Sequence, residues 1–290
     1  MRQILFEIPG LGLKIFGYGL MLFFAFLGSM HLAARRARRE GLDPEVIYDL
    51  ALWVFVGGLV GARGFYVFQY WGTKGLHGFW DIFKIWEGGI VLYGSIMGGT
   101  ATFFLYRALR PFPLRPMLDV IAPSLAFGVA IGRFGCFLNG CCYGDTCDLP
   151  WAVRFPRLSP PWEAEVARNL IPPGSAYSLP LHPTQLYSTL DGLILFALLT
   201  AFYPLRRRDG AVMGLLMVTY PITRFLIERL RDDEGAYFAG LTISQAISVG
   251  LLAGGLIYCL ALTRLPAGRY VDIVKPEHPE PVLDGATILT

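Results

Sequence analysis

IFGYGLMLFFAFLGSMHLAA, residues 15–34, is apolar along its length and carries His31 as its only basic side chain. A helix needs about 20 such residues to cross the hydrocarbon core of a bilayer. A removable signal peptide would place its cations before the apolar run, whereas here the arginine-rich segment 35–39 follows it. The stretch therefore predicts a retained membrane-spanning helix whose N-terminus lies outside.

Six further apolar stretches are long enough to cross a membrane, at 46–70, 90–109, 117–138, 186–205, 211–230 and 241–262. Hydrophobic residues make up 54% of the 290-residue chain and charged residues 16%, against about 25% charged in soluble domains. The net charge of +3 is small and dispersed, which argues against nucleic acid as a partner. The sequence predicts an all-α polytopic protein with seven transmembrane helices.

The distribution of arginine predicts the orientation of these helices. With the N-terminus outside, the loops after spans one, three and five and the C-terminus lie inside, and they carry the basic segments 35–39, 107–115, 206–208 and 264–275. Loops on the inner face of a membrane carry the excess of Lys and Arg. We expect a membrane domain over 1–265, with an irregular periplasmic head at 139–185, and a disordered cytoplasmic tail at 266–290.

Three arginines stand out inside predicted spans, well away from their ends: Arg63, Arg133 and Arg224. An arginine at the middle of a membrane helix costs about 2.5–3.5 kcal/mol on insertion scales, so each one needs a reason. Counting residues from the outer ends of their spans places all three roughly 8–10 Å below the outer surface. One layer of the outer leaflet is therefore predicted to hold three cations.

Other polar groups are expected at the same level: Tyr18, Tyr93, Asn139, His182, Gln185 and Glu228. Glu228 lies four residues after Arg224, on the same helix face. Together these groups predict a buried anion site reached from the outer leaflet. Individual residues also have explanations that involve no ligand. An arginine near a helix end can extend its side chain to the lipid headgroups, and tyrosines are common at the membrane interface.

Glycines surround these polar groups in two stretches, 88–99, which includes Gly94, and 132–140. Small residues allow either a neighbouring helix or a ligand headgroup to approach the backbone closely. Near the inner ends of their spans, Asp49 and Asp119 are interpreted as helix caps or solvated carboxylates. These features do not by themselves distinguish packing from binding.

The segment GRFGCFLNG, residues 132–140, resembles the signature of the prolipoprotein diacylglyceryl transferase family. Supporting segments are FGYGLM at 16–21, GAR at 61–63, WEGG at 86–89, HPTQLY at 182–187 and RFLIE at 224–228. Their order and spacing agree with the family over about residues 8–262. The family often has a histidine at the position of Tyr93, and Asn and Glu at those of Cys136 and Cys141. A histidine base or a carboxylate role is therefore not carried over to these positions.

The resemblance implies a bacterial inner-membrane enzyme that requires no cofactor. Such an enzyme moves the diacylglyceryl group of phosphatidylglycerol onto the thiol of a lipobox cysteine in a preprolipoprotein. This is the first step of lipoprotein maturation, and it forms a thioether and releases glycerol phosphate. Its partners are the lipid, the signal peptide of the acceptor and the bilayer.

This chemistry assigns expected roles to the polar layer. Arg133 and Arg224 are expected to bind the phosphate, because the fork of a guanidinium suits phosphate oxygens, with Arg63 as a third cation. The headgroup is expected to contact Tyr18, Asn139, Gln185 and Gly94. The acceptor thiol must lose its proton, and the base is left open among Tyr93, His182 and Glu228.

Two other classes of protein share parts of this sequence pattern. A transporter for an anionic substrate needs the same arginines but also a polar path to the inside and repeated halves. A thiol oxidoreductase or metal protein would use Cys136, Cys141, Cys142 and Cys147, but these lack Cys-x-x-Cys spacing. The sequence therefore predicts no metal site. Cys142 and Cys147 either close a short disulfide loop or stay free thiols.

The predicted orientation can be tested by labelling single cysteines in a background whose native cysteines are serine. A cysteine at Asn139 or His182 should react with an impermeant reagent added outside, and one at Arg207 only after the membrane is opened. The reverse pattern would contradict the topology.

Overall fold

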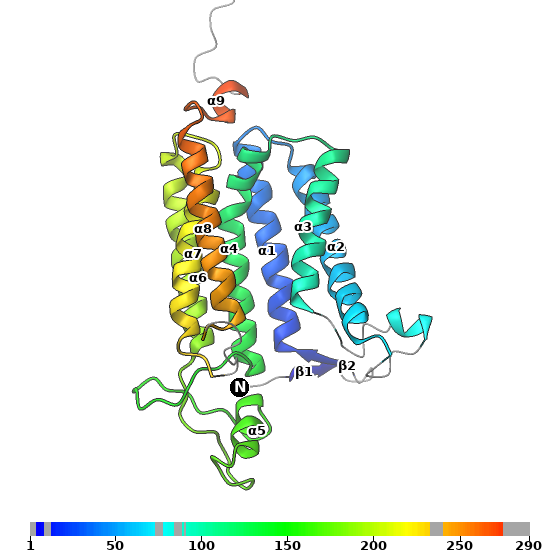
Figure 1. The fold of residues 1–290 in the computed structure, drawn as a ribbon, viewed down its shortest axis with the longest axis vertical. Coiled ribbons are helices and arrows are strands. Elements are labelled where there is room, and N and C mark those ends of the chain that lie inside the picture. Colours follow the sequence, from blue (N-terminus) through cyan, green and yellow to red (C-terminus); the bar gives the residue numbers. More distant parts are fainter. Residues whose placement is uncertain are drawn as a thin grey trace, which may run out of the picture.

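The computed structural model describes residues 4–8, 13–72, 78–83, 89, 91–232 and 240–274. Residues 86–88 of the WEGG segment and residues 275–290 of the predicted tail lie outside this description. The described chain is mostly helical, and its long helices stand side by side as one bundle (Figure 1).

The long helices are α1 Gly17–Arg39, α2 Pro44–Tyr70, α3 Leu92–Leu109, α4 Leu114–Asn139, α6 Thr184–Phe202, α7 Ala211–Glu228 and α8 Ile243–Thr263. Short helices are η1 Phe79–Phe83, α5 Pro160–Ala167, η3 Tyr203–Leu205 and α9 Tyr270–Val274. Among the described residues, six helices are long and apolar enough to cross a membrane: α1, α2, α4, α6 continued through η3, α7 and α8. The protein is thus a polytopic membrane protein.

Helix α3 covers the remaining predicted span but is not among those six helices. It has 18 residues and starts two residues later than the predicted stretch 90–109. In Figure 1 it stands beside α2 along the bundle. A seventh membrane crossing therefore stays a prediction.

Two short strands precede α1, so the prediction of an all-α chain was wrong at this point. Strand β1, Ile4–Ile8, pairs antiparallel with β2, Leu13–Phe16. Ile15 and Phe16, predicted to open the first span, instead lie opposite Phe6 and Ile4. The sequence Pro9-Gly10 is a turn signal between two runs rich in β-branched and aromatic residues. Counting apolar length alone missed that signal.

Glycines pack α2 against α3. A Cβ added to Gly94 would lie 2.3 Å from the backbone oxygen of Gly61, and one added to Gly98 would lie 2.3 Å from that of Gly57. Small residues at such positions allow two membrane helices to approach closely. Gly94, which the sequence placed among headgroup contacts, is therefore a helix-packing residue in this structure.

The other helices assemble around α4. It packs against α1, α6 and α7, and α7 packs against α8. In Figure 1 the β-hairpin and α5 lie at one end of the bundle and α9 lies at the other. We call the end with α5 the head end. Helices α2, α4 and α7 all finish there.

The segment between α4 and α6 contains α5 and several isolated β-bridges. Gly144 pairs with Arg231, and Thr146 pairs with Leu181. The amide of Asp145 donates to the oxygen of Leu230 at 2.9 Å. These bonds join the chain after α4 to the chain that follows α7.

A buried charge network holds the opposite end of the bundle together. The guanidinium of Arg206 pairs with Glu40, with Asp119 at 3.3 Å and with Asp209 at 3.6 Å. The Asp119 side chain is fully buried. Burying a charge is costly unless it is paired and hydrogen-bonded, so this network stabilises the bundle only as a complete set.

Asp119 also caps α7 from a neighbouring helix. Its carboxylate accepts hydrogen bonds from the amides of Gly210, Val212 and Met213 at 2.7, 2.9 and 3.0 Å. The first amides of a helix have no partner within that helix. The interpretation of Asp119 as a cap is confirmed, but the helix it caps is α7 rather than its own.

The beginning of the predicted disordered tail is ordered. The amide of Tyr270 donates to Asp209 at 2.6 Å, and the amide of Gly268 donates to the oxygen of Arg207 at 3.2 Å. Helix α9 is therefore attached to the loop before α7.

Replacing Asp119 with Ala should lower the free energy of unfolding by about 3–5 kcal/mol, because it removes one of the carboxylates around buried Arg206 and leaves three buried amides without their acceptor. Thermal unfolding in detergent measures this effect. The matched control is Asp49→Asn. Its pair with Arg110 is exposed, so its loss should cost under about 1 kcal/mol. Equal effects of the two changes would contradict the network.

Candidate functional site at the head end of the bundle

The three intramembrane arginines lie within the last two turns of α2, α4 and α7. Because these helices finish at the head end, the structure brings Arg63, Arg133 and Arg224 to the same end of the bundle (Figure 1). The side chains of Arg133 and Arg224 are close enough to interact electrostatically. Those two form the centre of the site.

Glu228 links two arginines on either side of it. Its Oε2 lies 2.5 Å from Nη1 of Arg224 and 3.1 Å from Nη1 of Arg231. Its Oε1 accepts a hydrogen bond from Oγ1 of Thr242 at 3.3 Å. The residue is 2% exposed. Both carboxylate oxygens are occupied, so Glu228 orients the arginines and is poorly placed to act as a base.

The first turn of α8 holds the other side of this group. Thr242 and Gln245 form a capping box, in which each side chain bonds the backbone amide of the other. This box fixes Thr242 against Glu228. It also sets Ser244, whose hydroxyl accepts a hydrogen bond from Nη2 of Arg224 at 3.3 Å.

Arg133 differs from Arg224 and Arg231, which both pair with Glu228. It is half-buried near the end of α4 and interacts electrostatically with Arg231, Tyr220, Cys136 and Cys142. Within the described part of the chain it makes no ion pair with a carboxylate and no hydrogen bond. Glu228 pairs with Arg224 and Arg231, whereas among the described residues the charge of Arg133 is left for another anion.

Three thiols gather immediately beyond Arg133. Helix α4 ends at Gly140, whose φ of +81° is the left-handed conformation typical of a helix C-terminus. This turn brings Cys141 and Cys142 back over Cys136, and the three sulfurs lie within 4.8 Å of one another. Hydrogen bonds from Cys136 and Cys142 hold the pKa of the Cys141 thiol below its usual value.

All five cysteines are free thiols in this structure, so Cys142 and Cys147 do not form the short disulfide loop considered above. The prediction of no metal site rested on the lack of Cys-x-x-Cys spacing. A helix-terminal turn followed by two cysteines gathers three thiols without that spacing.

Tyr18 and Asn139 join this part of the site. A Cβ added to Gly135 would lie 3.2 Å from Cδ2 of Tyr18, which shows how closely α1 approaches α4 here. Tyr18 interacts electrostatically with Arg133 and with the thiols. The side chain of Asn139 bonds the thiol of Cys141. Tyr18 thus lies near Arg133, and Asn139 lies beside the thiols.

Gln185 contacts the backbone of the thiol segment. It is 1% exposed, and its Nε2 donates to the backbone oxygen of Cys141 at 2.8 Å. The hydroxyl of Thr184 donates to the oxygen of Cys142 at 2.6 Å. In this structure Gln185 therefore positions the thiol segment rather than presenting its amide group to a ligand.

Arg63 holds the connection between α2 and α3. Its Nε donates to the oxygen of Ile82 at 2.8 Å and its Nη1 to that of Gly89 at 3.0 Å. The guanidinium also lies 5.3 Å from the ring of Tyr66. Its contacts with backbone carbonyls favour a structural role over the predicted phosphate contact.

Two of the predicted bases lie in other surroundings. Tyr93 is in the first turn of α3 and is 37% exposed. Nδ1 of His182 lies 3.3 Å from the hydroxyl of Tyr187, which accepts a hydrogen bond from Nε1 of Trp151. Among the described residues, the hydrogen bonds of His182 and Tyr187 do not include Arg133 or Arg224.

Sequence reasoning missed four residues of the site: Tyr220, Arg231, Thr242 and Ser244. Arg231 follows Glu228 by three residues, a spacing at which side chains of one helix meet. That spacing could have predicted the pair. Nothing local in the sequence predicts that the start of α8 would bring Thr242 to Glu228 and Ser244 to Arg224.

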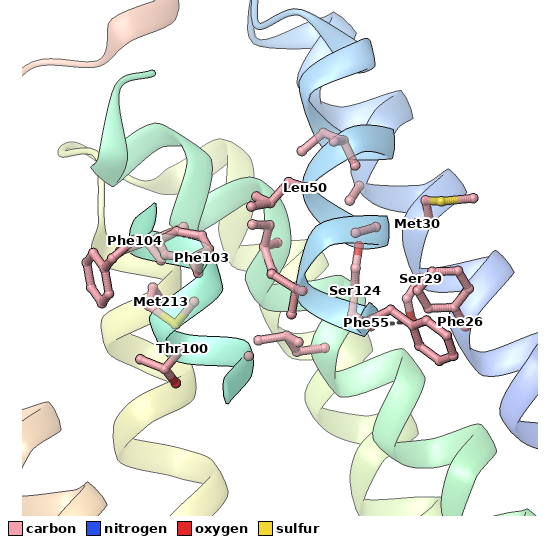
Figure 2. A pocket seen from close by; sticks show the side chains of 18 residues that line it. Phe26, Ser29, Met30, Leu50, Phe55, Thr100, Phe103, Phe104, Ser124 and Met213 are labelled. Carbon is pink, nitrogen blue, oxygen red and sulfur yellow. Dashed lines mark hydrogen bonds between the residues drawn. The ribbon is translucent and has the colours of Figure 1, made fainter. Parts of the chain in front are cut away.

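An apolar cavity of about 540 Å³ lies among α1, α2, α3 and α4 (Figure 2). Its lining includes Phe26, Met30, Leu50, Phe55 and Phe103. Ser29 and Ser124 also line it, and the hydroxyl of Ser29 donates to the backbone oxygen of Ser124 at 2.8 Å. The cavity thus presents mainly hydrocarbon surface.

Comparison with known proteins identifies close relatives. The family described as prolipoprotein diacylglyceryl transferase matches residues 3–261. A protein named phosphatidylglycerol–prolipoprotein diacylglyceryl transferase from Clostridium tetani is 31% identical over 256 residues, covering 88% of this chain and 96% of its own. Proteins of the same name from Synechococcus elongatus and Aeromonas salmonicida are 36% and 32% identical, and the alignments cover 91% and 88% of this chain and 89% and 88% of theirs.

Replacing Glu228 with Gln should lower the free energy of unfolding by about 3–5 kcal/mol, because it leaves two neighbouring arginines without their buried anion. Thermal unfolding of the purified variant measures this. Glu163→Gln, on the exposed side of α5, is the matched control and should change little. A Glu228 variant as stable as wild type would show that the carboxylate does not hold the arginines.

Proposed function

This chain belongs to the prolipoprotein diacylglyceryl transferase family, a family of enzymes, and we propose that it transfers the diacylglyceryl group of phosphatidylglycerol to a prolipoprotein. The acceptor is the thiol of the lipobox cysteine in the signal peptide. A carbon–sulfur bond forms, the carbon–oxygen bond to the phosphate breaks, and its electron pair leaves with glycerol phosphate. This is the first step of lipoprotein maturation.

The observation that carries this proposal is Arg133, a half-buried cation with no carboxylate partner among the described residues. The leaving group is a phosphate monoester, whose negative charge grows as the carbon–oxygen bond breaks. Prearranged cations in a site of low dielectric constant stabilise such a charge strongly. Arg133 is proposed to bind the phosphate together with Arg224, whose direction is set by Glu228.

Around the phosphate, Tyr18 and Asn139 are proposed to bond the glycerol headgroup, because Tyr18 lies beside Arg133 and Asn139 bonds the thiol of Cys141. The acyl chains then run along the bundle toward the apolar cavity. Its volume of about 540 Å³ is within the range of about 300–1,000 Å³ typical of ligand sites. The lipid is thus held by charge at the head end and by hydrocarbon contact below.

For the membrane arrangement we propose seven crossings, with α3 as the third, the N-terminus periplasmic and the C-terminus cytoplasmic. The arginine-rich segments 35–39 and 206–208 lie at the end opposite the head, which supports this orientation. The bacterial inner membrane is the proposed location. The site then opens toward the outer leaflet, where the signal peptide emerges.

An anion transporter is the alternative that the sequence left open. Membership of the transferase family argues against it. The cavity below the arginines is lined mainly by apolar side chains, whereas an anion crossing the membrane needs polar or charged groups along its path.

Arg133→Ala should reduce transfer by at least about 100-fold, because the developing phosphate charge loses a prearranged donor. Arg133→Lys should recover little, because an ammonium group is a point charge without the two-pronged fork of arginine. Transfer to a fluorescent lipobox peptide from phosphatidylglycerol in detergent measures both variants.

The control for this assay is Arg264→Ala, at an exposed position at the far end of α8, which should keep wild-type activity. Near-normal transfer by a folded Arg133→Ala variant would remove this residue from the mechanism.

A further inference from the structure

The thiols of Cys136, Cys141 and Cys142 form a cluster that has no role in the proposed binding of phosphate. Their sulfurs lie within 4.8 Å of one another, and all three residues are half-buried. A zinc ion binds thiolate sulfur at about 2.3 Å, which sets the sulfurs of one site about 3.8–4.0 Å apart. Shifts of less than about 1 Å would therefore let all three sulfurs bind one ion.

The backbone around these thiols is already fixed. Buried side chains of α6 bond the carbonyls of Cys141 and Cys142, from Gln185 at 2.8 Å and Thr184 at 2.6 Å. Cys142 has a φ of +62°, a conformation that residues other than glycine seldom adopt. Supporting hydrogen bonds of this kind hold metal ligands in place.

The charges nearby also suit a thiolate cluster. Three thiolates around a divalent ion carry a net charge of −1. Arg133 interacts electrostatically with Cys136 and Cys142 and also with Arg231. A complex of this charge is therefore stabilised by cations that are already present.

We propose that Cys136, Cys141 and Cys142 bind one zinc-type cation and leave a fourth coordination position for the acceptor thiol. This inference rests on the transfer reaction proposed above and adds to it the group that activates the nucleophile. Sites with three protein ligands characteristically keep an open position for water or substrate. Glu228, one of the proposed bases, is paired with two arginines and is therefore poorly placed to take the proton of the acceptor thiol.

The step balances without a further reactant. The acceptor thiol displaces water from the ion and releases its proton to the aqueous outer face. The bound thiolate then attacks the glyceryl carbon, and the carbon–oxygen electron pair leaves on the phosphate beside Arg133. The thioether product is neutral and binds the ion more weakly than a thiolate, so it departs.

Metal binding by the full-length protein in detergent is the first test. Reduced, chelator-treated protein is titrated with Cd²⁺, whose thiolate complexes absorb in the ultraviolet. One equivalent should bind and produce this absorption. Cys141→Ser should abolish it, and the matched control Cys147→Ser, on the same segment but outside the cluster, should retain it.

Two results would overturn the metal site. One is the absence of stoichiometric Cd²⁺ binding while thiol counting finds all three thiols free. The other is a disulfide between any two of the three in protein isolated without reductant. Neither measurement depends on transfer activity, so failure of the site and failure of the proposed function are distinguishable.

The role of the open position has its own test. Co²⁺-loaded protein should change its visible absorption when a lipobox peptide with cysteine is added, as a fourth thiolate binds. The same peptide with serine should cause no change. An identical spectrum with both peptides would show that the acceptor thiol does not reach the ion.

Transfer assays complete the test. A free thiol with a pKa of about 8.5 is only about 3% ionised at pH 7. Removing the metal should therefore slow transfer about 30-fold at pH 7, with activity recovering as the pH rises toward 9. Metal-loaded enzyme should show little dependence on pH in this range. Equal activity with and without metal at pH 7 would overturn the role in activation.

Discussion

A guanidinium inside a membrane bundle needs an anion beside it, and this requirement organises the head end of the protein. Glu228 satisfies it for Arg224 and Arg231. Arg133 has no such carboxylate among the described residues. The protein thus pairs Arg224 and Arg231 with its own carboxylate and leaves Arg133 available to a ligand. A lipid phosphate fits this arrangement because it brings the missing charge with its acyl chains in the hydrocarbon.

Much of this arrangement could be predicted from sequence. Counting residues from the ends of apolar runs placed Arg133 and Arg224 at one end of the bundle, and their proximity in the structure agrees. The partners of these arginines were harder to predict from sequence. The spacing of Arg224 and Glu228 indicated a contact, but Thr242 reaches Glu228 and Ser244 reaches Arg224 only through tertiary packing. Arg63 looked equivalent by depth, yet it bonds the backbone of the α2–α3 connection.

The errors have a common physical origin in local backbone geometry. A hairpin replaced the start of the first predicted span, because strand pairing uses apolar residues as well as a helix does. The left-handed turn at Gly140 gathered thiols that linear spacing had separated. At the other end, Asp119 caps a helix from another part of the chain. Hydropathy measures how apolar a segment is, but it does not describe where the chain turns.

Arg133 is proposed to receive the phosphate of the lipid. A structure of the protein in a lipid nanodisc containing phosphatidylglycerol tests this role. The phosphate should lie within hydrogen-bonding distance of Arg133 and Arg224, with acyl chains directed toward the apolar cavity. A headgroup bound elsewhere, with Arg133 engaged by a carboxylate of its own chain, would contradict it.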